Sequence, residues 1–147
     1  MFLENRKARH DYTIMDHMEA GIVLTGAEVK SLRLKRGSMH DAFVKILGNE
    51  VYVVNMLIQQ YDFSPGKTYE ATRSRKLLLH KAQIRKLAEY LGTNGLTAVP
   101  LMVGEHNHYM KVLIGIGKGK KQYDRKKELK ERDLRRENDR AMKSTRS

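Results

Sequence analysis

Apolar and polar residues alternate over several short stretches of this chain, which is the pattern of strands with one buried face. The pattern is clearest over residues 109–116, where four apolar side chains share one face: Met110, Val112, Ile114 and Ile116. An apolar stretch over 96–103 precedes it, and the polar segment 104–108 between the two predicts a turn. We therefore expect two strands joined by a turn in this part of the chain.

A hairpin is predicted between residues 42–47 and 51–58. Both stretches are rich in apolar and β-branched side chains, and the short segment 48–50, which contains Gly and Asn, separates them. A further strand is expected within residues 10–25, where an apolar run ends at Gly26. The Pro-Gly pair at 65–66 predicts a loop that follows the hairpin.

The hydrophobic period changes to that of a helix over residues 81–91. Four apolar residues fall on one helical face there, namely Ile84, Leu87, Ala88 and Leu91, and Gly92 follows where a C-terminal cap belongs. Residues 27–36 predict a shorter helix, because Val29 and Leu32 are three positions apart. Its other face is expected to expose Lys30, Arg33, Lys35 and Arg36.

These stretches amount to about six short strands and two or three helices. The content predicts a mainly β fold over residues 1–117, a small OB-like six-stranded antiparallel β-barrel with flanking helices. An open antiparallel sheet with helices on one face is the alternative. Residues 1–9 are polar and basic, and we expect them to form an unstructured leader.

Charge distinguishes the C-terminal segment from the rest of the chain. The chain has a formal net charge of +12, and residues 118–147 hold 13 Lys/Arg against 6 Asp/Glu. So few apolar residues remain there that we expect a basic tail, disordered when free. Acid-first pairs such as Glu128 and Arg132 favour a helix on binding, and a tail that never orders is the alternative. The expected partner is a polyanion, with RNA the strongest candidate.

The sequence gives no support to catalysis, metal binding or membrane insertion. The chain has no Cys, and the spacing of its six His matches no zinc site. No Gly-rich phosphate loop or nucleophile motif is recognisable, no apolar run is long enough to span a membrane, and the N-terminus does not resemble a signal peptide. We expect a cytoplasmic protein that is not an enzyme and uses no cofactor or small-molecule substrate. A ribonuclease that uses His10 or His80 is a distant alternative.

Two short basic segments are candidates for phosphate contacts. In residues 73–79, three cations (Arg73, Arg75 and Lys76) stand beside three leucines. We expect Leu77 and Leu79 to enter the core and Leu78 to be the one that faces outward. Residues 118–121 combine Lys with Gly at the end of the last predicted strand, where a flexible linker is an equally good interpretation.

Five short blocks, taken in order, resemble the small protein B family, the bacterial tmRNA-binding proteins of trans-translation. The blocks span residues 5–10, 19–21, 28–33, 75–79 and 118–121. The resemblance implies an OB-like barrel that binds the tRNA-like domain of tmRNA and promotes its aminoacylation. It also implies delivery to stalled ribosomes with the GTP-bound elongation factor, while the tail probes the decoding centre and lies as a helix in the empty mRNA channel. A general single-strand RNA-binding or RNA-chaperone protein is the alternative.

The resemblance also implies which residues bind. Asn5, Glu19 and Leu78 match tmRNA-contacting positions, and the expected set is completed by the cations Arg6, Lys7, Arg73, Arg75 and Lys76. The barrel-to-tail motif is carried by Lys118, Gly119, Lys120 and Lys121. The segment directed at the ribosome comprises Tyr123, Asp124, Arg125 and Lys126. Its Tyr123 stands where many members have His, a change that preserves aromatic stacking.

Two departures from the family pattern are visible, and one of them is Leu129 in the tail, where Ile is common. In the other, residues 34–36 read Leu-Lys-Arg where the family usually has a small residue, Gly and Lys. The departure puts the RNA contacts of that loop in question and leaves the predicted fold unchanged.

Overall fold

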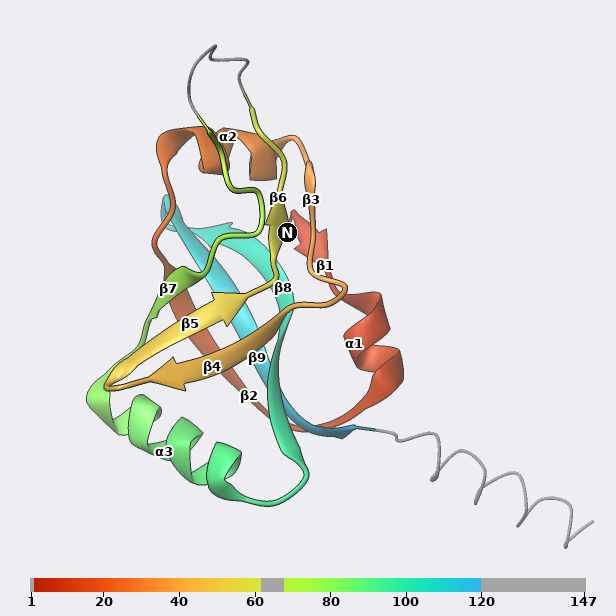
Figure 1. The fold of residues 1–147 in the computed structure, drawn as a ribbon, viewed down its shortest axis with the longest axis vertical. Helices are drawn as coiled ribbons and strands as arrows, with labels where there is room; N and C mark the ends of the chain where they lie inside the picture. The colour runs from red at the N-terminus through yellow and green to blue at the C-terminus, as the bar shows by residue number, and fades with distance from the viewer. Residues whose placement is uncertain (1, 62–67, 120–147) are drawn as a thin grey trace, which may run out of the picture.

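The computed structural model describes residues 2–61 and 68–119, which form a mainly β fold with three helices (Figure 1). The helices are α1 (Arg6–Asp11), α2 (Gly26–Arg33) and α3 (Lys81–Gly92). The long strands are β2 (Tyr12–Ile22), β4 (Phe43–Leu47), β5 (Glu50–Val54), β7 (Arg75–Leu78), β8 (Leu96–His106) and β9 (Tyr109–Gly119). Three two-residue strands complete the fold: β1 (Leu3–Glu4), β3 (Gly37–Ser38) and β6 (Leu57–Ile58).

The six long strands close into an antiparallel ring. Their order is β8-β4-β5-β7-β2-β9, and β9 pairs again with β8 to complete the circle. β1 pairs with Met102 and Val103 of β8, away from the β4 contact at Ala98, and β3 pairs with β6 in a separate small sheet. The six-stranded antiparallel arrangement is therefore confirmed, and the open-sheet alternative is wrong.

The core fills the inside of the ring. The predicted inward face of β9 is confirmed, because Met110, Val112, Ile114 and Ile116 are all buried. Leu32 of α2 and Leu87 of α3 are fully buried in the same core, and Figure 1 shows these two helices at opposite ends of the fold. Leu77 is buried and Leu78 exposed, as the sequence predicted.

The predicted unstructured leader is wrong. Residues 3–4 form β1, and α1 begins directly after Asn5. The Asn5 side chain is only 1% exposed: it accepts a hydrogen bond from the Ala8 N–H and donates to the carbonyl oxygens of Met39 (2.8 Å) and Pro100 (2.9 Å). These long-range hydrogen bonds fix the segment to the ring, and no local sequence pattern predicts them.

The two hairpins have shorter turns than the sequence predicted. β4 and β5 are joined through Gly48 and Asn49, with Gly48 at φ +62°. β8 continues to His106, so that only Asn107 and His108 form its turn, both at positive φ. Such two-residue turns match the twist of the flanking strands. The predicted single strand 51–58 is interrupted at Asn55, also at positive φ, and β6 pairs elsewhere.

The two longer helices lie close to their predicted positions. α2 begins with a capping box between Thr25 and Glu28, and its predicted cationic side chains are exposed. It ends with Lys35 in the left-handed region, at φ 59°. α3 includes Gly92 as its last residue, so its C-terminal cap is Thr93, one position after the predicted cap. Among the described helices, none is long and apolar enough to cross a membrane.

Candidate nucleic-acid interface

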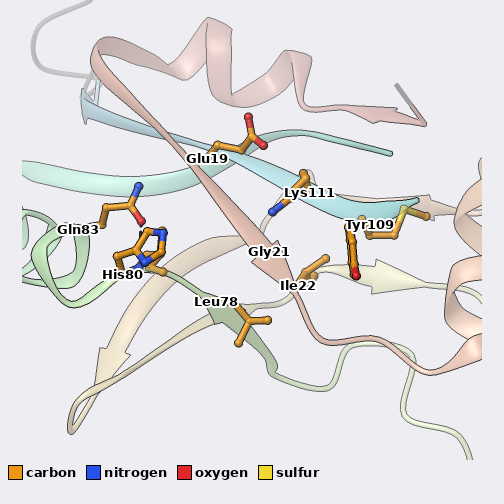
Figure 2. Close-up of a pocket in the computed structure, with 10 residues that line it drawn as sticks. Glu19, Gly21, Ile22, Leu78, His80, Gln83, Tyr109 and Lys111 are labelled. Atoms are coloured by element: carbon orange, nitrogen blue, oxygen red, sulfur yellow. Dashed lines mark hydrogen bonds between the residues drawn. The ribbon is translucent and has the colours of Figure 1, made fainter. Parts of the chain in front are cut away.

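A cavity of about 390 Å³ opens where β2, β7 and β9 meet the start of α3 (Figure 2). Its lining combines an acid, a cation, two aromatic rings and apolar groups. The lining residues are Glu19, Gly21, Ile22, Leu78, Leu79, His80, Gln83, Tyr109, Met110 and Lys111. The structure thus brings Glu19 and Leu78, predicted from separate blocks, to one place.

Strand register explains this meeting. Gly21 of β2 lies opposite Leu78 on one side and opposite Lys111 on the other, so the three form a row across neighbouring strands. Gly21 leaves room at the centre of the row, since a Cβ there would lie 3.3 Å from the Leu78 Cβ. Glu19 precedes Gly21 by two residues and therefore projects from the same face of β2.

The cavity presents unusually exposed apolar groups beside polar ones. Leu78 is 54% exposed and Tyr109 is 71% exposed. Figure 2 shows Leu78, Tyr109 and Lys111 around the opening, with His80 and Gln83 along another side. The Gln83 Oε1 accepts a hydrogen bond from the His80 N–H (3.0 Å), which fixes the amide at the first turn of α3. A leucine, a phenol ring and an ammonium group in one opening suit an unstacked nucleotide and its phosphate.

Arg75 is not part of this surface, contrary to the prediction. Its side chain is fully buried, and its Nε lies 2.7 Å from the Glu28 Oε2. Its remaining N–H groups donate to the Tyr69 hydroxyl (3.4 Å) and to main-chain carbonyls, including those of Met56 (2.6 Å) and Ala71 (2.9 Å). Every donor direction is used inside the protein, so this arginine has a structural role.

Glu28 is the centre of that buried network. Burial acts to raise the pKa of its carboxyl group. Hydrogen bonds from Arg73, the Thr25 N–H and Arg75 outweigh burial and hold the pKa below its usual range. Arg73, about one third exposed, is ion-paired to Glu28 and reaches the surface only in part.

The predicted contacts on α1 lie apart from the cavity. Asn5 is buried and can affect binding only by positioning α1. Arg6 is exposed, whereas the Lys7 Nζ lies 2.9 Å from the Asp41 Oδ1, a hydrogen bond that raises the pKa of Lys7. Lys7 lines a second cavity of about 360 Å³ beside β4. No residue lines both cavities.

The remaining predicted positions are only partly described. Lys76 is partly exposed, with its Nζ 3.2 Å from the Glu50 Oε1. β9 continues through Lys118 and Gly119, and Lys118 is paired with Thr13 and Leu96. The other positions lie outside the described residues: Lys120, Lys121, Tyr123, Asp124, Arg125 and Lys126.

Sequence reasoning missed the four other residues of the cavity with polar or aromatic side chains, namely His80, Gln83, Tyr109 and Lys111. The alternation in β9 placed Tyr109 and Lys111 on the outward face, which was a usable signal. For His80 the sequence suggests only a nuclease base, in the distant ribonuclease alternative. Within the described parts of the chain, no three His, Asp or Glu side chains are grouped so as to hold a metal ion.

Comparison with known proteins shows which family the chain belongs to. The family model described as SmpB protein matches residues 2–144. An SsrA-binding protein of Enterococcus hirae is 45% identical over 144 residues, covering 98% of this chain and 94% of the relative. That of Halalkalibacterium halodurans is 46% identical over 140 residues, covering 95% and 91%.

A solved structure indicates the same family. It is described as "tmRNA-SmpB: a journey to the center of the bacterial ribosome", and its matching chain superposes with a TM-score of 0.69. The two chains are 43% identical, with 82% of this chain and 85% of the other covered. From the family model, the full-length relatives and this structure together, the chain belongs to the SmpB protein family.

Proposed function

We propose that this chain binds tmRNA in trans-translation and accompanies it to the ribosome. Its relatives are named for binding SsrA RNA, and the related structure is a tmRNA–SmpB ribosome complex. The observation that carries the proposal is the cavity that joins Glu19 and Leu78 with Tyr109 and Lys111. These residues come from three strands that a closed ring holds at fixed spacing.

The chemistry of the cavity suits a folded RNA. Folded RNAs are recognised through their shape and through bases that have left the stack. Leu78 and Tyr109 offer apolar surface to such a base, and Lys111 offers a cation to a neighbouring phosphate. The Glu19 carboxylate accepts hydrogen bonds only, so it selects donors such as base amino groups and ribose hydroxyls. A duplex without unstacked bases cannot use this combination.

The finer roles belong to the same proposal. The barrel binds the tRNA-like domain, which promotes its aminoacylation and its delivery with the GTP-bound elongation factor. The tail, which includes Tyr123, Asp124, Arg125 and Lys126, enters the decoding centre and the empty mRNA channel. The lysines of the barrel-to-tail motif, residues 118–121, contact ribosomal RNA. The protein acts in the cytoplasm by binding alone, without a catalytic step or a cofactor.

A titration of the full chain tests tmRNA recognition. A tRNA-like tmRNA fragment and an ordinary tRNA of equal length are compared at one salt concentration, because charge alone imitates specificity. We expect the tmRNA fragment to bind at least about tenfold more tightly, a difference of about 1.4 kcal/mol. Equal affinities would overturn the proposal and favour a general single-strand RNA-binding protein.

Truncation tests the proposed division between barrel and tail. The cut belongs after Gly119, because β9 pairs with β2 up to that residue. The truncated chain should bind the tmRNA fragment nearly as well as the full chain and fail to support tagging on stalled ribosomes. Strong loss of tmRNA affinity would contradict this division.

A further inference from the structure

The outer face of the β4–β5 hairpin and the adjoining β7 carries a second group of exposed apolar and cationic side chains. Phe43, Lys45 and Leu47 alternate on β4 with inward residues, and all three are exposed. Tyr52 of β5 and Lys76 of β7 project from the same side. We call these residues, Phe43, Lys45, Leu47, Tyr52 and Lys76, the hairpin face.

Register aligns three of these residues in a row. Lys45 is the Cα partner of Tyr52, and Tyr52 is in turn the partner of Lys76. Neighbouring strands lie about 4.8 Å apart, so Tyr52 stands between two lysines on the adjoining strands. An outward strand face that carries Phe and Leu is unexpected for a surface that meets only water. The row therefore has the composition of a stacking platform with flanking phosphate contacts.

Glu50 contacts two residues of the hairpin face. The Tyr52 hydroxyl donates a hydrogen bond to Glu50, and the Lys76 Nζ lies 3.2 Å from the same carboxylate. These contacts lower the pKa of Glu50, chiefly through the Tyr52 hydrogen bond, so it stays ionised. The Lys45 side chain has no ion-pair or hydrogen-bond partner among the described residues. Two cations against one acid leave the face positively charged.

We propose that the hairpin face binds a single-stranded segment of RNA, with a base stacked on Tyr52 and phosphates beside Lys45 and Lys76. β4 and β5 are the second and third strands of the ring in chain order, and in OB folds the face of strands 2 and 3 binds oligonucleotides. The inference rests on the proposed function only in taking RNA as the ligand. The face itself lies outside the cavity that contains Glu19 and Tyr109.

Single-stranded RNA fits this face better than a duplex. The half-buried ring of Tyr52 can stack only on a base that is free of its own neighbours. Phe43 and Leu47 widen the apolar surface along β4, whereas phosphates of a paired stem would meet few cations there. Glu50 competes with phosphate for Lys76. The hairpin face therefore binds RNA less tightly than it would if Lys76 had no carboxylate partner.

The test uses the full chain and a short oligouridylate, which has no tRNA-like shape. Nuclear magnetic resonance titration should shift the amide signals of β4, β5 and β7. Affinity is then measured for Tyr52→Phe, which keeps the ring, and for Tyr52→Thr, which keeps strand propensity without the ring. Arg36→Gln, an exposed charge change in the segment that follows α2, is the control for Lys45→Gln.

We expect Tyr52→Thr to weaken oligouridylate binding about fivefold or more, while Tyr52→Phe stays close to the unaltered protein. Lys45→Gln should reduce the slope of log affinity against log salt concentration by about 0.7, and Arg36→Gln should reduce it less. Glu50→Gln removes a competing negative charge and should strengthen binding. Unchanged signals on β4 and β5, or equal affinity of the Thr and Phe variants, would overturn the inference. The basic tail is the same in every variant, so differences report this face, and failure here leaves tmRNA recognition at the cavity untouched.

Discussion

The Glu28 carboxylate and the Arg75 guanidinium form a fully buried ion pair, with 2.7 Å between Oε2 and Nε. The pair joins α2 to β7, two elements separated by more than 40 residues. Arg73 adds a second guanidinium to the same carboxylate, and the Tyr69 hydroxyl lies 3.4 Å from it. Because β7 also carries Leu78, the network fixes the strand that delivers this leucine to the cavity.

Replacement of Arg75 should destabilise the protein. Arg75→Met leaves Glu28 with a single cationic partner, the partly exposed Arg73, and breaking a buried pair costs about 3–5 kcal/mol. Urea unfolding followed by circular dichroism should show most of that loss, with Arg73→Met as the milder control. A variant of unchanged stability that binds tmRNA poorly would mean that Arg75 contacts RNA directly.

Arg75 also marks where sequence reasoning fails. A cation in a basic segment predicts a surface contact, because Lys and Arg are almost never fully buried unless paired. The partner that makes burial possible is Glu28, which no local pattern connects to it. Asn5 is a similar case, since its hydrogen bonds reach Met39 and Pro100.

Periodic elements were predictable for the opposite reason. The inward face of β9 and the helix of α3 follow from the spacing of apolar residues, since both patterns repeat along the chain itself. Only some residues of the cavity could be predicted from the sequence. Glu19 and Leu78 came from family resemblance, whereas Tyr109 and His80 join them only through strand pairing and the start of α3.

Replacement of Lys35 by Gly should stabilise the protein. Lys35 has φ 59° just after α2, where its N–H donates to the Leu32 carbonyl (2.9 Å) and the Arg36 N–H to that of Ser31 (3.0 Å). This end motif usually has Gly at the left-handed position, since a Cβ there is unfavourable. We expect a gain of about 0.5–1 kcal/mol in urea unfolding.

Lys35→Ala is the matched control for that prediction. It removes the same charge and keeps the Cβ, so the unfavourable φ remains and stability should change little. Equal gains from Gly and Ala would show that charge repulsion, and not backbone geometry, limits stability at this position.

Loss of the Tyr90 hydroxyl should change the response to acid. The Tyr90 hydroxyl donates to the Asp16 Oδ2 (2.6 Å), and with the His17 N–H and Lys86 it lowers the pKa of Asp16 to about 2. A lowered folded-state pKa stabilises the protein above the unfolded value of about 3.9, and the stabilisation disappears as pH falls toward 2.

Tyr90→Phe should therefore unfold at a lower urea concentration than the unaltered protein at pH 6. The loss in free energy of unfolding should be about 1 kcal/mol. The difference should shrink steadily between about pH 4 and pH 2. A difference that stays constant over this range would show that the hydroxyl acts independently of Asp16 ionisation.

The most direct test of the account compares two leucines of matched exposure. Leu78 is 54% exposed in the cavity, and Leu34 is 53% exposed at the end of α2. Leu78→Ala should weaken binding of the tRNA-like tmRNA fragment about tenfold, as loss of a partly buried leucine contact predicts, and leave urea unfolding unchanged. Leu34→Ala should change neither. Equal affinity of the Leu78→Ala and Leu34→Ala variants for that fragment would contradict tmRNA recognition at this cavity.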